Sequence, residues 1–292
     1  MKFLFDIIKG AFIGVANIIP GVSGGTMAVS MGVYDKLIEA INKLTKEFKK
    51  SFLTLLPLVI GMAAGIGIFS YIIPYSLNHF AFQTCMCFAG LVIGGIPQII
   101  GETRSALEKE KKKFNPVHII AFLIMLGIAV GMALANGSEA GAATLAIDAK
   151  SIIMLVIIGV IAAATMIIPG VSGSLIMMIL GYYTGVVSLV RDCISALKNL
   201  DWNALLHCLV LILPFAIGCI AGVLLVSKLI SWLFKKFESV TYCAILGLIF
   251  ASPFAIFYNM ESCTFNAVTI IVGIIFFTVS AAFTYFFSKK TR

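Results

Sequence analysis

The chain consists of long apolar runs separated by short polar segments. Six of these runs are long enough to cross a membrane as helices, because a hydrocarbon core of about 30 Å takes about 20 apolar residues. The predicted spans are residues 52–75, 81–101, 117–135, 204–227, 240–258 and 266–287. The pattern therefore predicts an all-α integral membrane protein.

Two further apolar segments, residues 3–33 and 151–190, are each interrupted by the same seven residues, IIPGVSG, at 18–24 and 167–173. Proline lacks a backbone donor and glycine weakens a helix, so a helix break is expected at each site. Serine is a good N-cap, and we expect new helices to begin near Ser23 and Ser172. Each segment is predicted to enter and leave the membrane on one side, as a broken re-entrant helical hairpin.

The two interruptions belong to an internal repeat. A shift of 149 positions aligns the motifs and also pairs Gly32 with Gly181 and Tyr34 with Tyr183. Three further blocks recur in the same order: LLPLVIGMAAG with LILPFAIGCIAG, GLVIGG with GLIFAS, and FNPVHII with FNAVTII. We therefore predict two repeats, residues 1–145 and 146–292, which together form one membrane domain.

The charge distribution predicts how the repeats are oriented. The chain is 61% hydrophobic and only 12% charged, so its net charge of +8 indicates basic cytoplasmic loops rather than nucleic-acid binding. The densest basic segments are 36–50 and 102–116, and the chain ends in KKTR. With these segments and both termini in the cytoplasm, every loop agrees if each repeat contains three full crossings plus one re-entrant hairpin. The repeats then have inverted topology, as in many transporters that work by alternating access.

Two broken segments that enter from opposite faces should meet near the membrane midplane. Non-helical backbone at this depth needs protein or a watery cavity around it. A restarting helix exposes unpaired N–H groups and a partial positive charge, which suits an anion, and nearby hydroxyls add donors. The predicted phosphate-binding residues are Asn17, Pro20, Gly21, Ser23, Gly24, Gly25, Thr26, Thr165, Pro169, Gly170, Ser172, Gly173 and Ser174.

A simpler interpretation of the motif is tight helix packing, because Gly21 and Gly25 have the small-xxx-small spacing that lets helices approach closely. The segments GMAAG (61–65), GIAVG (127–131) and GCIAG (218–222) have the same spacing. For these three segments we favour packing.

Charged residues near the membrane form a second group of candidates. Most loop-edge charges only set topology, but Asp35 could have a gating or proton-linked role, and Arg104 and Arg191 could meet a phosphate at the inner and outer surfaces. The auxiliary candidates are Asp35, Lys36, Glu102, Arg104 and Arg191.

The sequence does not favour an enzyme. Phosphoryl chemistry needs a nucleophile with a general acid or base, or metal-binding carboxylates. None of the three histidines lies near either motif, the seven cysteines are scattered, and no carboxylate cluster lies within the spans. We predict no catalytic residues, metal or cofactor; the sequence does not specify a coupling ion such as H+ or Na+. The first thirty residues lack a signal-peptide cleavage site after a clean apolar core, so we expect them to be part of the fold.

The doubled IIPGVSG motif, the segment IIPGVSGGTMAVSMGVYDKLIEAI (18–41) and the duplicated layout resemble the bacterial polyprenyl-phosphate translocase family. This resemblance implies transport of undecaprenyl phosphate, the lipid carrier of cell-wall precursors, from the outer to the inner leaflet of the cytoplasmic membrane. It also implies that the motif residues from Pro20 to Thr26 and from Pro169 to Ser174 handle the lipid phosphate. One departure is Thr184, where family members often carry an acid after LGxY.

An alternative function is a secondary transporter or channel for a small anion, which the same broken helices would also suit. The two hypotheses differ in the path they need, since a soluble solute requires an enclosed polar route and a lipid requires an opening to the bilayer. The expected partners are a polyprenyl phosphate lipid and membrane lipids, without nucleic acid.

Overall fold

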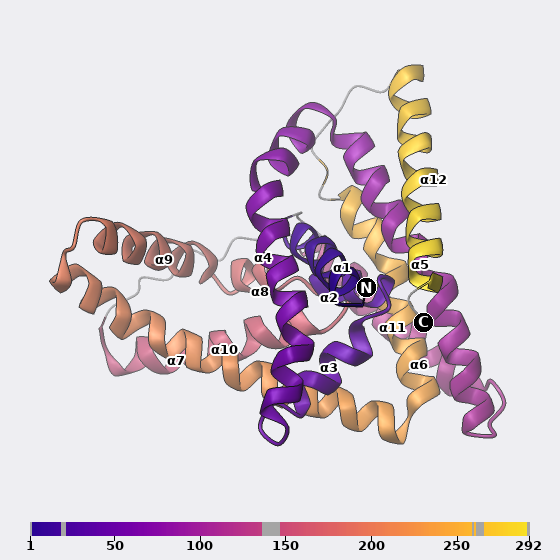
Figure 1. Cartoon of the computed structure of the whole chain (residues 1–292), viewed down its shortest axis with the longest axis horizontal. Coiled ribbons are helices and arrows are strands. Elements are labelled where there is room, and N and C mark those ends of the chain that lie inside the picture. The colour runs from indigo at the N-terminus through magenta and orange to yellow at the C-terminus, as the bar shows by residue number, and fades with distance from the viewer. Residues whose placement is uncertain (1, 19–21, 136–146, 259, 261–265, 291–292) are drawn as a thin grey trace. The chain divides into compact units, whose positions relative to one another are not determined.

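The computed structural model describes residues 2–18, 22–135, 147–258, 260 and 266–290, and within these ranges the secondary structure is helical (Figure 1). The helices are α1 (Lys2–Ala16), α2 (Gly24–Ser30), α3 (Tyr34–Asn42), α4 (Phe48–His79), α5 (Ala81–Lys109), α6 (Pro116–Leu134), α7 (Ala149–Ile167), α8 (Gly173–Ile179), α9 (Tyr183–Lys198), α10 (Trp202–Lys236), α11 (Glu238–Tyr258) and α12 (Ala267–Lys290). The expected all-α class is confirmed for this part of the chain.

Seven helices in the described residues are long and apolar enough to cross a membrane. Six of them, α4, α5, α6, α10, α11 and α12, confirm the six predicted spans as helices. The seventh is α7, whose 19 residues form the first limb of the second interrupted segment. By contrast, α2 and α8 have seven residues each, about 10 Å, and cannot cross alone. Re-entrance of the two interrupted segments stays a prediction.

The helices break and restart where the motifs predict. α1 ends at Ala16 and α7 at Ile167, and the next helices begin at Gly24 and Gly173. Ser23 and Ser172 occupy the N-cap positions with extended backbone, at φ −99° and φ −96°. Gly170 has φ +75°, a left-handed backbone conformation that residues other than glycine rarely adopt. The backbone of the second bend therefore requires glycine at position 170.

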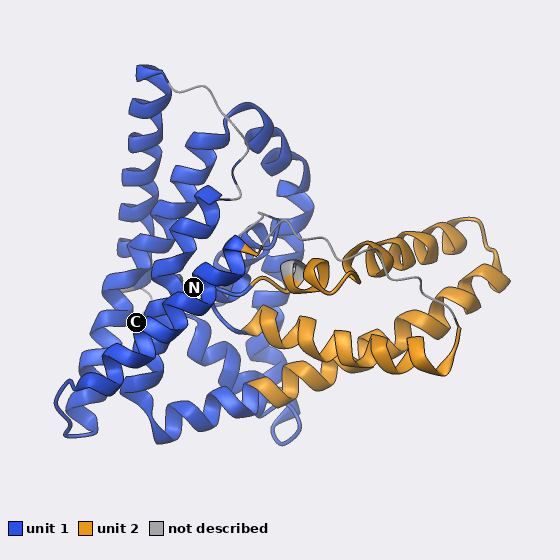
Figure 2. Ribbon diagram, turned by 180° about the vertical axis from the view of Figure 1, so that it is seen from behind, with its two compact units in different colours: residues 1–134, 168–171, 227–292 blue, residues 135–167, 172–226 orange. Residues whose placement is uncertain are grey.

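The chain forms two compact units (Figure 2). Unit 1 contains residues 1–134, 168–171 and 227–292, and unit 2 contains residues 135–167 and 172–226. These units follow helix packing rather than the predicted repeats, because α11 and α12 pack with α5 and α6 in unit 1. The division into repeats at residue 145 stays a prediction about the sequence.

Glycines set the closest helix contacts in unit 1. Gly90 and Gly94 of α5 pack on the backbone of α12 at Phe277 and Ala281, whereas Gly247 of α11 packs on α6 at Phe122. Gly90 and Gly247 belong to matching blocks of the two sequence halves, GLVIGG and GLIFAS. Each of these matching helices therefore packs against the last span of the other half.

The contact between α1 and α4 depends on the predicted small-residue spacing. Gly61 lies against Ile7 and Gly65 against Ala11, so close that a Cβ on Gly61 would be 2.8 Å from the carbonyl carbon of Ile7. Because glycine has no side chain, the backbones of α1 and α4 can approach closely, and dispersion contacts then stabilise the helix pair. The packing prediction for GMAAG is confirmed.

Unit 2 repeats this contact between α7 and α10. Gly218 lies against Val156, and Gly222 lies against Val160. Both glycines follow their counterparts in α4 by 157 positions, and both valines follow the α1 residues by 149. The packing prediction for GCIAG is confirmed, and the sequence duplication corresponds to a repeated helix pair.

The prediction for GIAVG was wrong. A Cβ added to Gly127 or Gly131 would meet nothing within 4 Å in the described part of the protein. The two glycines lie on a face of α6 that has no neighbouring helix in the described residues. α6 instead contacts α11 through Phe122 and Leu126.

The first and last helices of the chain lie side by side in unit 1. The rings of Phe5 and Phe287 have centroids 5.6 Å apart, and those of Phe12 and Phe283 are 5.4 Å apart. The beginning of α1 therefore lies beside the end of α12, as expected if both termini face the same side (Figure 1).

Candidate functional site

The breaks of the two motifs meet inside unit 1. The backbone N–H of Gly170 donates a hydrogen bond to Oγ1 of Thr26 at 2.6 Å, and Ser23 Oγ donates to the carbonyl oxygen of Ile168 at 3.5 Å. Segments 144 or more positions apart in sequence thus share backbone and hydroxyl contacts. We call Ser23, Thr26 and residues 168–171 the paired breaks.

The paired breaks lie against the middle of α11, and the end of α2 lies against the middle of α5. A Cβ on Gly170 would be 2.9 Å from the carbonyl oxygen of Leu248, which is ten residues from either end of α11. Similarly, Ser30 at the end of α2 packs on Gly95, fourteen residues from either end of α5. The motifs are therefore placed at mid-length of two helices that are long enough to span a bilayer.

The hydroxyls of this region are buried. Thr26 and Ser30 are fully buried and Ser23 is 5% exposed. Ser30 Oγ donates to the Val92 carbonyl at 3.4 Å, and Ser252 Oγ of α11 lies 3.5 Å from Thr26 Oγ1. Burying a polar group is costly unless it is hydrogen-bonded, so these contacts stabilise a polar cluster within an apolar helix bundle.

The side chain of Asn17 lies beside Gly24, the first residue of α2. This side chain is exposed, and a Cβ on Gly24 would be 2.6 Å from Asn17 Oδ1. Gly24 therefore leaves room for the Asn17 amide beside the first turn of α2. Gly25 is buried in the same turn, whereas Pro20 and Gly21 lie outside the described residues.

The remaining candidates of the second half are divided between the units, with Pro169 in unit 1 and Thr165, Ser172, Gly173 and Ser174 in unit 2. The Thr165 hydroxyl donates to its own helix, at the carbonyls of Ile161 and Ala162, 3.0 and 2.9 Å away. Ser172 is half-buried and Gly173 is buried; Pro169, in unit 1, is buried as well. The side chain of Ser174 lies outside the described residues. The Thr165 hydroxyl is therefore hydrogen-bonded within its own helix.

Helix dipoles contribute less here than the sequence suggests. Because α2 and α8 are each only about 10 Å long, the negative end of each helix lies close to its positive end and offsets part of its potential. Hydroxyls and the N–H groups of the bends are the main polar groups that the paired breaks offer.

Asp35 makes a contact that sequence reasoning missed. Tyr242 of α11 donates a hydrogen bond from its hydroxyl to Asp35 Oδ2 at 2.8 Å. Desolvation by the surrounding protein raises the pKa of the Asp35 carboxyl, the Tyr242 hydrogen bond partly offsets this, and the charges of Glu102 and Glu238 raise it further. The charge of Glu102 therefore acts on Asp35, so two of the auxiliary candidates interact electrostatically.

The other auxiliary candidates lie elsewhere. Lys36 forms an ion pair with Asp6 of α1 at 2.6 Å, which ties α3 to α1. Arg104 is exposed on α5, and Arg191 is exposed on α9 in unit 2. Within the described residues of unit 1, neither Lys36 nor Arg104 is among the residues that contact the paired breaks.

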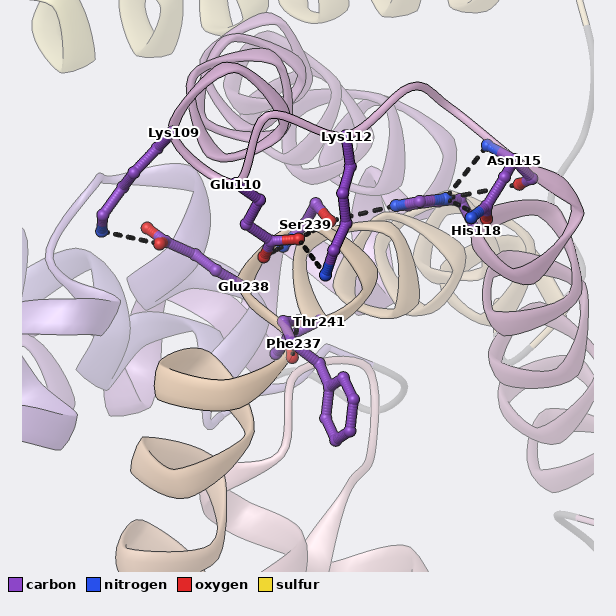
Figure 3. Close-up of polar contacts among 9 residues, drawn as sticks. All are labelled: Lys109, Glu110, Lys112, Asn115, His118, Phe237, Glu238, Ser239 and Thr241. Atoms are coloured by element: carbon purple, nitrogen blue, oxygen red, sulfur yellow. Dashed lines mark hydrogen bonds and ion pairs between the residues drawn. The ribbon is translucent and has the colours of Figure 1, made fainter.

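A polar cluster anchors the α5–α6 connection to the start of α11 (Figure 3). Glu110 accepts hydrogen bonds from the backbone N–H and the hydroxyl of Ser239, at 3.1 and 3.0 Å. His118 is 1% exposed and contacts Ser239 Oγ through Nε2 at 3.0 Å. Desolvation opposes ionisation of Glu110, but hydrogen bonds from Lys112 and Ser239 outweigh it and lower its pKa. Within the described residues, no group of three or more His, Cys, Asp or Glu is arranged to hold a metal ion.

Within the described residues, the helical fold with seven candidate spans, repeated helix pairs and a buried polar cluster at mid-length of α11 defines a multi-pass membrane protein. The chain belongs to the undecaprenyl phosphate translocase-like family, whose sequence profile matches residues 13–270. The resemblance noted from the doubled motif is confirmed.

Two relatives cover most of the chain. It is similar to the polyprenyl-phosphate transporter of Staphylococcus aureus (strain NCTC 8325 / PS 47), with 31% identity over 280 residues and 94% of each chain covered. It is also similar to the polyprenyl-phosphate transporter of Vibrio cholerae serotype O1 (strain ATCC 39315 / El Tor Inaba N16961), with 27% identity over 262 residues, 85% of this chain and 75% of the relative. No solved structure gives a significant match.

Proposed function

We propose that this protein transports polyprenyl phosphate, with undecaprenyl phosphate as the expected substrate, from the outer to the inner leaflet of a bacterial cytoplasmic membrane. Family membership and the two relatives support the substrate class. The observation that carries the mechanism is the hydrogen bond between Gly170 and Thr26, which joins the two interrupted segments beside the middle of α11.

The paired breaks offer the groups that a phosphate head needs. Transfer of an unpaired ion into hydrocarbon costs on the order of tens of kcal/mol, whereas a hydrogen bond to a charged group contributes about 1.5–3 kcal/mol. In the mechanism we propose, the Gly170 N–H and the hydroxyls of Ser23 and Thr26 exchange their mutual bonds for bonds to phosphate oxygens. The isoprenoid tail stays in lipid, so only the head requires a polar path.

The duplication supports our proposal of alternating access. The α1–α4 pair and the α7–α10 pair use equivalent glycine contacts, so each can move as a rigid pair. We propose that the two repeats have inverted topology and open the paired breaks to one leaflet at a time, with both termini in the cytoplasm. The charged residues of the chain do not identify a coupling ion, so the transport assay includes both H+ and Na+ gradients.

The test uses the purified protein in liposomes that carry polyprenyl phosphate in both leaflets. A phosphatase that cannot cross the membrane, added outside, should hydrolyse only the outer pool in empty liposomes and both pools when the protein is present. The assay is run without a gradient and with imposed H+ or Na+ gradients. Release of trapped inorganic phosphate, without lipid hydrolysis beyond the outer pool, would favour the small-anion alternative and overturn the proposal.

Variants of Thr26 test the role of the paired breaks. Thr26→Val removes the acceptor of the Gly170 N–H, and an unsatisfied buried donor costs about 1–3 kcal/mol. Transport should fall at least about fivefold, while Thr26→Ser keeps the hydroxyl and should retain transport. Thr103→Val is the matched control, because the buried Thr103 hydroxyl bonds only to its own helix at Ile99. Equal transport by the two valine variants would contradict the assignment.

A further inference from the structure

A cavity of about 740 Å³ lies in unit 1, away from the paired breaks. It is formed by residues of α3 (35–43), the α5–α6 connection (109–112), and the hairpin of α10 and α11 (231–242), and we call it the basic cavity. The charge pattern predicts that the first two of these segments lie on the cytoplasmic side, and here they surround one space together with the α10–α11 hairpin. Five lysines and four carboxylates line it.

The charges of the basic cavity are unequally paired. Three lysines each form an ion pair with a cavity carboxylate: Lys43 with Glu39 at 2.6 Å, Lys109 with Glu238 at 2.7 Å, and Lys112 with Glu110 at 3.0 Å. Figure 3 shows the last two pairs. The fourth carboxylate, Asp35, accepts the hydrogen bond from Tyr242.

Lys235 and Lys236 are the two remaining cations. Neither forms an ion pair with a carboxylate in the described part of the chain, and both are exposed. The Lys236 ammonium lies 5.2 Å from the centroid of the Trp232 ring, a cation–π contact that leaves its hydrogen-bond donors available. A concave surface with excess positive charge raises the local concentration of anions.

We infer that the basic cavity binds a phosphate monoester, with Lys235 and Lys236 as its anion-binding residues. A phosphate monoester carries about 1.5–2 negative charges at neutral pH, and lysine binds it as a mobile point charge. The inference rests on the proposed function: the ligand would be the head of polyprenyl phosphate on the cytoplasmic side.

The path from the paired breaks to this cavity follows α11. Tyr242, which lines the cavity, precedes Ser252, which contacts Thr26, by ten residues, about 15 Å of helix. This is about half of a hydrocarbon core of about 30 Å. A head that leaves the middle of α11 would reach the basic cavity at the membrane surface, where water and the lysines replace the contacts of the paired breaks.

Substitution of Asp35 should change phosphate binding in the direction opposite to substitution of the lysines. Its carboxylate opposes an anion in the cavity, so Asp35→Asn should tighten phosphate binding while Asn still accepts the Tyr242 hydrogen bond. Substitution of the unpaired lysines should weaken binding. A non-specific loss of structure would weaken binding in every variant.

The experiment measures binding of farnesyl phosphate, farnesol and inorganic phosphate to the full chain in phosphatidylcholine nanodiscs. Lys235→Gln with Lys236→Gln should weaken farnesyl phosphate binding about tenfold, or about 1.4 kcal/mol, without affecting farnesol. Lys46→Gln with Lys49→Gln makes the same charge change at exposed lysines that do not line the cavity, and should have no effect. The same lysine effect in a Thr26→Val background would assign it to the cavity rather than to the paired breaks.

The outcomes separate the two proposals. Lysine-dependent binding of farnesyl phosphate alone supports a lipid head, and lysine-dependent binding of inorganic phosphate as well supports a site for the phosphate group itself. Unchanged binding in the Lys235 and Lys236 variant, or an equal loss in the control pair, would overturn the cavity assignment even if the liposomes show lipid transport. Lysine-dependent binding without lipid transport would overturn the proposed function and leave a free-phosphate site.

Discussion

Replacement of Gly61 by alanine should separate α1 from α4. A Cβ at this position would be 2.8 Å from the Ile7 carbonyl carbon, 2.9 Å from the Ala11 nitrogen, and closer still to the Ile7 carbonyl oxygen. An ordinary contact begins at 3.4 Å, so the helices must part by at least about 0.6 Å. Both neighbours are backbone atoms and cannot turn aside. Overpacking of this kind costs about 1–3 kcal/mol.

Gly67→Ala is the matched control in the same helix. Nothing lies within 4 Å of a Cβ there, and alanine has the higher helix propensity by up to about 1 kcal/mol. Thermal unfolding of the purified variants in detergent should rank Gly67→Ala at or above the unsubstituted protein and Gly61→Ala below it. Because α1 leads into the first break, the liposome assay should also show slower transport for Gly61→Ala. Equal unfolding temperatures for the two variants would refute the close-packing argument.

Three further predictions use the same assays. Gly218→Ala should destabilise as Gly61→Ala does, since it repeats that contact in unit 2; a neutral effect on thermal unfolding would contradict the equivalence of the helix pairs. Because the folded-state pKa of Asp35 is raised, its contribution to stability is largest at low pH and is lost as pH rises through that pKa; unfolding scans between about pH 4 and about pH 8 should show this slope, and Asp35→Asn should flatten it. Changing Ser23 and Ser172 together to leucine should abolish lipid transport while the protein still inserts in the membrane, and full transport by this variant would exclude the serine turns from head binding.

Features that depend on local composition and periodicity could be predicted from the amino-acid sequence alone. Six spans could be predicted because a bilayer fixes the length of apolar helix that it accepts. The two breaks could be placed because adjacent proline and glycine weaken a helix. The restarts also follow the prediction, since Ser23 and Ser172 occupy the N-cap positions, although neither side chain makes a capping hydrogen bond. The duplication was also visible in the sequence, and the shared glycine contacts give it structural meaning.

Contacts between residues far apart in the sequence could be known only from the folded structure. The spacing of Gly127 and Gly131 matches that of Gly61 and Gly65, yet only the second pair faces a neighbouring helix, because the orientation of a helix face depends on its partners. Neither Tyr242 beside Asp35 nor Ser252 beside Thr26 carries a local signal, since each contact joins residues more than 200 positions apart. Likewise, the basic cavity arises because three segments from both halves of the chain converge at one place, which no local pattern encodes.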